Sequence, residues 1–255
     1  MLVVSAAPTL QYLHVVLGQC LFLVCPLHVY HFIKEPKTWK EAQRYCKEHY
    51  TDLATVYDMN DIQRLSRSVN TGEAWIGLYN DGRQDNRVWH WSLPGVEVTK
   101  YFWADDQPND YSGDTQNCVM IQKWDSRPCD EKKPFFCYKE NMILIKEKKT
   151  WEEASDYCIK NHRGLVSITD SSQQRWAAMK AKEADTGYVW LGLRYSCVLD
   201  LWFWVNDELV CYKNWASDKE PVEGCDRAVA MSKGGEHKWH TKAETEEFNF
   251  ICALH

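Results

Sequence analysis

The sequence lacks several features that would point to catalysis, nucleic-acid binding or an intracellular metal site. Lys and Arg number 30 against 36 Asp and Glu among 255 residues, so no basic surplus favours nucleic acid. Serine-hydrolase elbows, His-Glu-x-x-His helices, phosphate-binding glycine loops and Asn-x-Ser/Thr sequons are all absent. The sequence therefore excludes nucleic acid as a partner, gives no positive support to an enzyme and predicts no N-glycan.

Charged residues are absent from the amino-terminal stretch between Met1 and Ile33. The stretch is apolar but is broken by proline and polar residues, whereas a spanning helix needs about 20 predominantly apolar residues. Despite the missing basic n-region, it is more typical of a signal peptide cleaved between Gly18 and His28. We predict a signal peptide over residues 1–25, a secreted extracellular protein and no membrane span in the mature chain. The alternative is a protein anchored to a membrane through this apolar segment.

Cysteine is abundant, with 11 residues, yet no Cys-x-x-Cys pair of the kind used in metal and redox sites occurs. This usage is typical of an oxidising compartment and a disulfide framework. Because cleavage falls near Cys20 and Cys25, the presence of these two residues in the mature chain stays open.

The sequence contains an internal repeat. The motif Trp-Lys-Glu-Ala at Trp39 returns as Trp-Glu-Glu-Ala at Trp151, 112 positions later, and Trp-Ile-Gly-Leu at Trp75 returns as Trp-Leu-Gly-Leu at Trp190. Repeats of this length are domains rather than solenoid units. We predict domain 1 over residues 26–139 and domain 2 over residues 140–255, with no flexible spacer between them.

Each copy begins with helix signals and continues with strand signals. Thr38 with Glu41, and Thr150 with Glu153, have the spacing of a capping box that begins a helix. A second helix follows in each copy; its expected inward residues are Met59, Ile62, Leu65 and Val69 in the first copy, and Trp176 and Met179 in the second. Short apolar runs bounded by turn residues then predict strands, so each copy is an α+β domain.

The order of these motifs resembles the C-type lectin-like domain family. A cysteine lies in the first helix, a Trp-Ile/Leu-Gly-Leu strand and a Trp-x-Trp strand follow, and a last cysteine lies in the final strand. The resemblance covers about residues 28 to 255, and the tandem arrangement is similar to short relatives of the macrophage mannose receptor. It implies domains with two helices, small antiparallel sheets and a long ligand loop, in a non-enzymatic extracellular protein that binds a glycan or a cell-surface protein.

The resemblance also implies disulfides. Three follow the family pattern: Cys46–Cys137, Cys118–Cys129 and Cys158–Cys252. In domain 2, Cys225 aligns with Cys118, but Glu244 stands where the partner cysteine is expected. Two extra cysteines flank the Trp-Phe-Trp strand, and three cysteines allow three pairings. We expect Cys197–Cys211 to bridge this hairpin and Cys225 to be free or paired outside its domain.

Sugar-binding members of this family hold one Ca²⁺ with oxygens from the long loop and the next strand. The candidates in domain 1 are Gln107, Asn109, Gln116 and Asp125 at matching positions, and Asp110, which lies nearby outside the pattern. The family has Glu in place of Gln116 and Asp in place of Ser126, so only Asp125 is a carboxylate at a matching position. Since Ca²⁺ takes about six to eight oxygens, the resemblance implies at most a degenerate calcium site. The alternative is that these amides only satisfy an exposed loop.

Two aromatic residues, Trp103 and Tyr111, flank this loop and are candidates for stacking on a sugar, or for supporting the loop from the core. Domain 2 reads Glu220-Pro221-Val222 and Trp239-His240-Thr241, which lacks the calcium ligands. His237 and His240, with Glu236 and Glu244, do not predict zinc, because strand residues three apart face opposite sides.

Two functions follow from the sequence. The first is an extracellular recognition protein that binds carbohydrate through the degenerate calcium site of domain 1. The alternative is a calcium-independent protein-binding module of the same fold with no sugar activity.

Overall fold

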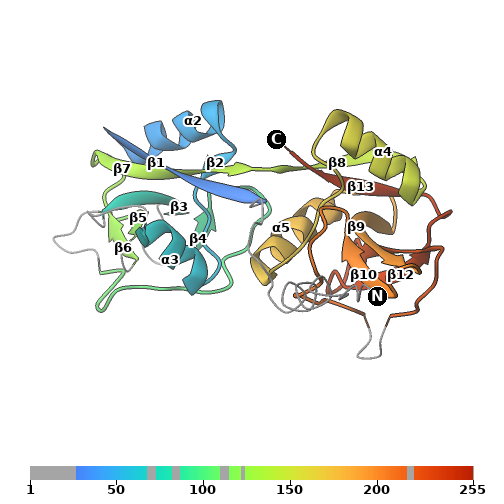
Figure 1. The fold of residues 1–255 in the computed structure, drawn as a ribbon. Helices are drawn as coiled ribbons and strands as arrows, with labels where there is room; N and C mark the ends of the chain where they lie inside the picture. Colours follow the sequence, from blue (N-terminus) through green and yellow to red (C-terminus); the bar gives the residue numbers. More distant parts are fainter. Residues whose placement is uncertain are drawn as a thin grey trace, which may run out of the picture. The chain divides into compact units, whose positions relative to one another are not determined.

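The computed structural model describes residues 27–67, 73–81, 87–109, 115–121, 124–216 and 221–254. The chain divides between Glu140 and Asn141 into two compact units. Each unit has two helices and one mixed sheet among its described residues (Figure 1). The predicted tandem α+β organisation is confirmed.

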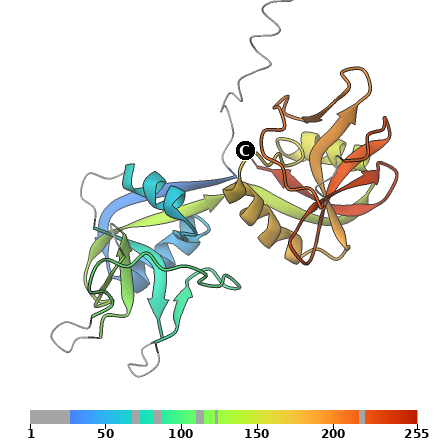
Figure 2. The same cartoon turned by 90° about the horizontal axis from the view of Figure 1, so that it is seen from below.

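Domain 1 is built on a mixed sheet with the strand order β1-β7-β3-β5-β6, in which β2 also pairs with β7 and β4 with β3. The long strands β1 and β7 lie side by side and antiparallel (Figure 2). Strand β3 runs parallel to β7, with Trp75 opposite Phe135. The elements are β1 (His28–Lys37), α2 (Trp39–His49), β2 (Asp52–Leu53), α3 (Met59–Arg67), β3 (Ala74–Asn80), β4 (Trp89–Trp91), β5 (Cys118–Ile121), β6 (Asp125–Arg127) and β7 (Lys133–Glu140).

The first helix of each domain begins at the predicted capping box. The Thr38 side chain accepts from the Glu41 amide at 3.3 Å, and the Glu41 carboxylate accepts from the Thr38 amide at 3.0 Å. Thr150 and Glu153 make the same reciprocal pair in domain 2. These bonds satisfy amides that have no partner inside the helix, so the local sequence fixes where each helix starts.

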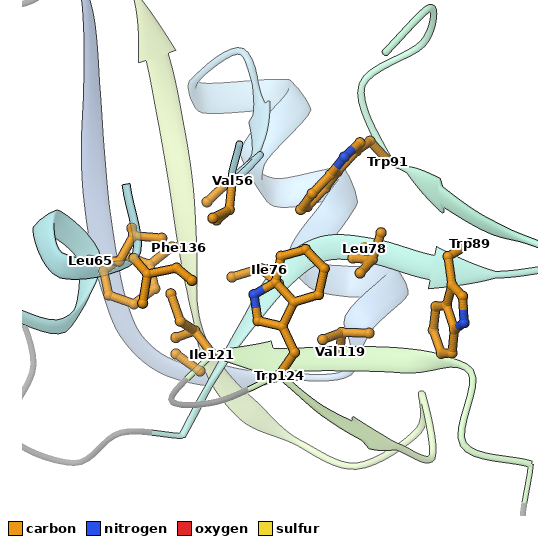
Figure 3. Packing of buried hydrophobic residues seen from close by; sticks show 13 residues of the cluster. Val56, Leu65, Ile76, Leu78, Trp89, Trp91, Val119, Ile121, Trp124 and Phe136 are labelled. Carbon is orange, nitrogen blue, oxygen red and sulfur yellow. The ribbon is translucent and has the colours of Figure 1, made fainter. Parts of the chain in front are cut away.

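Strand β3 separates two cores in domain 1 because its side chains alternate between faces. Ile76 and Leu78 pack in one cluster with Leu65 of α3, while Trp75 packs in another with Trp39 of α2. Helices α2 and α3 accordingly lie on opposite sides of the sheet (Figure 1). Figure 3 shows the ring of Trp124 among the aliphatic side chains of the α3 cluster.

One residue of the predicted α3 stripe is misplaced. Ile62 and Leu65 are buried as expected, but Met59 is 53% exposed, so its prediction as an inward residue is wrong. Met59 is the first residue of the helix, so no preceding helical turn covers its side chain. Val69 lies outside the described residues.

Domain 2 repeats this plan with the strand order β12-β11-β9-β13-β8 and β10 paired with β9. Strand β13 runs parallel to β9, as β7 does to β3. The elements are β8 (Met142–Lys149), α4 (Trp151–Asn161), α5 (Ser171–Lys182), β9 (Tyr188–Ser196), β10 (Leu201–Trp204), β11 (Arg227–Ser232), β12 (Trp239–Ala243) and β13 (Phe248–Ala253). In α5, Trp176 is buried and Met179 is half-buried.

The repeated tryptophans explain the repeated motifs. The Trp39 indole donates to the carbonyl of Ile76 at 2.8 Å, and the Trp151 indole donates to the carbonyl of Leu191 at 2.9 Å. Each bond ties the first helix to the Trp-Ile/Leu-Gly-Leu strand. The bond satisfies a buried indole N–H in each domain, so the two motifs stabilise each other.

The glycine of this strand permits a close backbone approach. A Cβ on Gly192 would lie 2.7 Å from Cγ2 of Val205 and 2.9 Å from the carbonyl oxygen of Leu165. On Gly77 the nearest atom would be the carbonyl oxygen of Leu53, at 3.2 Å. In both domains the space beside this glycine is too small for an added Cβ without a shift of its neighbours, and it is smaller in domain 2.

Four disulfides connect described cysteines. The three bridges implied by the family pattern are confirmed: Cys46–Cys137, Cys118–Cys129 and Cys158–Cys252. The two long bridges join residues 91 and 94 positions apart and tie the first helix to the last strand. Closing loops of this length contributes about 4 to 5 kcal/mol in the chain-entropy model.

The predicted pairing of Cys197 with Cys211 is wrong, and so is the expectation that Cys225 is free or paired outside its domain. Cys197 bonds to Cys225, and Cys211 also takes part in a disulfide. Strands β9 and β11 are antiparallel, with Ala228 opposite Arg194. Extending that register by three residues on each strand places Cys225 directly opposite Cys197. The bridge therefore follows a pairing between distant strands rather than the local hairpin.

Glu244 occupies in domain 2 the place that Cys129 has in domain 1. The Trp39 amide donates to the carbonyl of Cys129, and the Trp151 amide donates to the carbonyl of Glu244, both at 3.0 Å. Instead of a bridge, Glu244 pairs with Arg194 at 3.5 Å. Burial raises the pKa of the Glu244 carboxyl, and Arg194 opposes this shift.

Candidate functional site

The candidate site in domain 1 lies where the long loop returns to strand β6. The Trp124 amide donates to the carbonyl of Phe102 at 3.1 Å, and the Ala104 amide donates to the carbonyl of Trp124 at 2.9 Å. Strand β6 pairs with β5, and the Cys118–Cys129 bridge closes the same hairpin. These backbone contacts hold the loop against the strand end that carries Asp125 and Ser126.

Two polar side chains at the family positions, Gln107 and Gln116, meet at the side chain of a third, Ser126. The Ser126 hydroxyl lies 2.8 Å from Oε1 of Gln107 and 3.1 Å from Oε1 of Gln116, and the Ser126 amide donates to the same Gln107 oxygen at 3.2 Å. Ser126 is fully buried and Gln116 nearly so. The peptide between Gln107 and Pro108 is cis. The structure thus brings Gln107 and Gln116 together, with their oxygens used inside the protein.

Asp125 is engaged by a cation from its own strand. Its Oδ2 accepts from Nε of Arg127 at 3.2 Å and from the terminal guanidinium nitrogen at 2.7 Å. Residues two apart on a strand share one face, which explains the pair. The one carboxylate that the family pattern retains is therefore already matched by a positive charge.

This donor set does not fit a calcium ion. Ca²⁺ binds several oxygens at once, and carboxylates supply most of its affinity. Here the amide oxygens accept from Ser126, and the carboxylate accepts from Arg127. Across the described ranges, no group of three or more His, Cys, Asp or Glu side chains could hold a metal. Asp110 lies outside those ranges, and Asn109 is at the exposed end of the described loop.

An aromatic pair borders the same loop. Trp103 is half-buried and contacts Trp89 and Trp124, with ring centroids 4.8 and 5.8 Å apart, so it supports the core. Tyr101 stacks on Trp103 at 6.1 Å with an interplanar angle of 11°, and it is 51% exposed. The sequence interpretation missed Tyr101, although its spacing of two residues from Trp103 in extended chain was the available signal. Tyr111 lies outside the described residues.

The corresponding strand of domain 2 presents different chemistry. Trp239 is buried, and the ring of His240 packs against Tyr188 at 5.2 Å. Burial, followed by the charge of Lys242, lowers the pKa of His240. His237 contacts the carbonyl of Ser232 at 3.1 Å. The other two residues weighed for zinc form ion pairs, Glu236 with Lys238 and Glu244 with Arg194. Glu220 lies outside the described residues.

Comparison with known proteins identifies the family. The model of the Lectin C-type domain matches residues 35–139 and 147–254, which is most of the chain. The protein therefore belongs to the C-type lectin domain family, and it carries two tandem copies of the domain.

Two human proteins are among the relatives of this chain. C-type mannose receptor 2 is 23% identical over 259 residues, covering 88% of this chain and 17% of the relative. Lymphocyte antigen 75 is 28% identical over 247 residues, covering 84% and 14%. This chain spans about a sixth of the length of these relatives.

Similar solved structures each cover about half of the chain. Human lithostathine is 28% identical with a TM-score of 0.40, over 46% of this chain and 87% of that one. The trimeric Kupffer cell C-type lectin receptor Clec4f is 25% identical with a TM-score of 0.41, over 53% and 97%.

Proposed function

We propose that this protein is a non-enzymatic extracellular recognition protein whose domain 1 binds its ligand without calcium. The observation that carries the proposal is the internal use of the oxygens at the family's calcium positions. An ion at these positions would compete with the contacts of Gln107 and Gln116 to Ser126, and with the contact of Arg127 to Oδ2 of Asp125. A buried hydroxyl left without a partner costs about 1 to 3 kcal/mol, which opposes ion binding.

The ligand contact in this proposal is Tyr101, stacked on Trp103. Half of the Tyr101 side chain is open to solvent, and Trp103 is fixed by Trp89 and Trp124. A rigid aromatic ring beside polar loop atoms suits either the apolar face of a sugar or the side chains of a protein. We place a glycan or a cell-surface protein as the partner; the name of the mannose receptor among the relatives favours a glycan.

A binding screen of the mature chain tests this function. We expect binding to a glycan microarray or a panel of cell-surface proteins that is equal in Ca²⁺ and in EDTA. Tyr101→Ala should weaken it about tenfold, since an aromatic contact of this kind contributes roughly 1 to 2 kcal/mol. Met59→Ala is the matched control, because Met59 is equally exposed in the same domain but lies on α3. Loss of binding in EDTA, or binding to neither panel, would contradict the proposal.

Secretion is part of the same proposal. The predicted signal peptide and the alternative membrane anchor both fall outside the described residues. No helix among the described ranges is long and apolar enough to cross a bilayer. Intact mass of the chain released from expressing cells tests the prediction, with cleavage expected between Gly18 and His28.

A further inference from the structure

Domain 2 exposes apolar side chains at one end, on two loops. Val198 and Leu199, between β9 and β10, are 93% and 62% exposed, and Val222, before β11, is 63% exposed. A single exposed apolar residue is ordinary on a protein surface. Three from two joined loops are informative, because apolar clusters on a surface mark interaction sites.

Two contacts hold these loops together. The Cys197–Cys225 disulfide links their bases. The Tyr195 hydroxyl lies 2.5 Å from Oδ1 of Asp200 and 3.4 Å from Oε2 of Glu223, so one oxygen atom lies within reach of both carboxylates. Asp200 directly follows Leu199, and Glu223 directly follows Val222. The apolar residues of both loops therefore belong to one end of the domain.

The same end carries negative charge. Asp200 and Glu223 are exposed, and neither forms an ion pair with a residue that the structure describes. Nearby, Asp226 already pairs with Arg227 at 3.5 Å. The hydrogen bond to Asp200, then burial, then the charges of the two carboxylates raise the pKa of Tyr195 to about 12, so the hydroxyl keeps its proton. The hydroxyl can donate its single proton to only one of the two carboxylates, so the other carboxylate oxygens can accept hydrogen bonds from another donor.

We propose that this bridged tip, made by Val198, Leu199, Asp200, Val222 and Glu223, is a docking surface for a protein segment that presents apolar side chains beside lysine or arginine.

Apolar surface and charge both favour this occupant. Covering the valine and leucine side chains removes apolar surface from water, which is favourable. The two carboxylates form their strongest hydrogen bonds with donors that carry a positive charge. The tip is also held in place before binding: besides the disulfide, the Leu199 amide donates to the Ser196 hydroxyl at 3.2 Å. A fixed surface loses little conformational freedom when a partner binds, which favours affinity.

A random twelve-residue peptide library displayed on phage is the probe, selected against the immobilised mature chain. We expect enriched peptides that carry apolar residues next to lysine or arginine. Asp200→Asn with Glu223→Gln should weaken their binding about tenfold, because a charged hydrogen bond contributes more than a neutral one. Val198→Ser with Leu199→Ser should have a similar effect.

The matched control changes the same charge elsewhere in domain 2. Asp156 and Glu247 are exposed, and Asp156→Asn with Glu247→Gln leaves the tip intact. Non-reducing peptide mapping confirms that Cys197–Cys225 still forms in every variant. Equal binding by tip and control variants, or enrichment of peptides without basic residues, would overturn the proposal. Self-association of the wild-type chain that the serine variant abolishes would also overturn it, since the occupant would then be a second copy.

This surface stands apart from the proposed function of domain 1. The Tyr101→Ala variant serves as the check, because it should leave peptide binding at the tip unchanged.

Discussion

Calcium should have no effect on the thermal stability of this protein, although its family is known for calcium sites. A ligand at 100 times its Kd adds about 2.7 kcal/mol to the free energy of unfolding. For a domain of about 110 residues, 1 kcal/mol corresponds to about 4 °C in Tm, so an occupied site would raise the Tm by about 10 °C. We expect less than 1 °C between millimolar Ca²⁺ and excess EDTA, measured by calorimetry on the mature chain.

A designed variant that should bind calcium provides a positive test of the same reasoning. Gln116→Glu and Ser126→Asp restore the family's carboxylates, but the structure shows that Arg127 would still compete for Asp125. We therefore expect the double variant to gain little, and the addition of Arg127→Ala to create a measurable calcium-dependent rise in Tm. In EDTA the triple variant should melt below the wild type, because three neighbouring carboxylates repel one another without a counter-charge.

Two results would refute this reasoning. A rise of several degrees in the wild type would show that the Ser126 and Arg127 contacts yield to the ion. A triple variant that folds, with Cys118–Cys129 intact, and still shows no rise would show that the loop does not have lectin-like geometry.

Three further predictions concern stability. Arg194→Met should lower the Tm of domain 2 by about 4 °C at pH 7, because about 1 kcal/mol from a partly exposed ion pair with Glu244 is lost. Burial raises the pKa of Glu244, so this loss of Tm should shrink near pH 4, where that carboxyl is protonated; an equal loss at both pH values would contradict the pairing. Replacing Cys197 and Cys225 together by serine should cost about 3.5 kcal/mol in denaturant unfolding for a span of 28 residues, and peptide mapping that joins Cys197 to Cys211 would rule the bridge out. Gly192→Ala should lower the stability of domain 2 by about 1 kcal/mol or more beyond the loss that Gly77→Ala causes in domain 1. The added methyl group would lie 2.9 Å from a backbone oxygen at Gly192 and 3.2 Å from one at Gly77. The reverse order of the two losses in thermal melts would be inconsistent with this packing.

Local chemistry accounts for what the sequence predicted well. A capping box is complete within four residues, so Thr38 and Thr150 identify helix starts without knowledge of the rest of the fold. The long disulfides followed from the family pattern, since the repeated motifs place Cys46 and Cys158 at matching points.

Long-range register accounts for what the sequence did not predict. The choice of Cys197–Cys211 used distance along the chain, whereas the bridge to Cys225 depends on how β9 pairs with β11. The pairing of Arg127 with Asp125 was likewise not predicted, because the family pattern specifies the calcium ligands and not the neighbouring cations that compete for them. Tyr101 was missed because exposure is a property of the packed domain.

The two domains share their internal contacts and differ at the surfaces that we propose bind ligands, and this contrast bears on function. The indole bonds of Trp39 and Trp151, the capping boxes and the long disulfides occur in both copies. In contrast, domain 1 ends in a neutral polar cluster around Ser126 beside an aromatic pair, and domain 2 ends in an apolar tip with two carboxylates. A surface that stacks on a ring or a sugar and one that attracts a basic, apolar segment do not fit the same ligand. The tandem is therefore better suited to two different partners than to one ligand bound twice, and variants at Tyr101 and at Asp200 should separate the two activities.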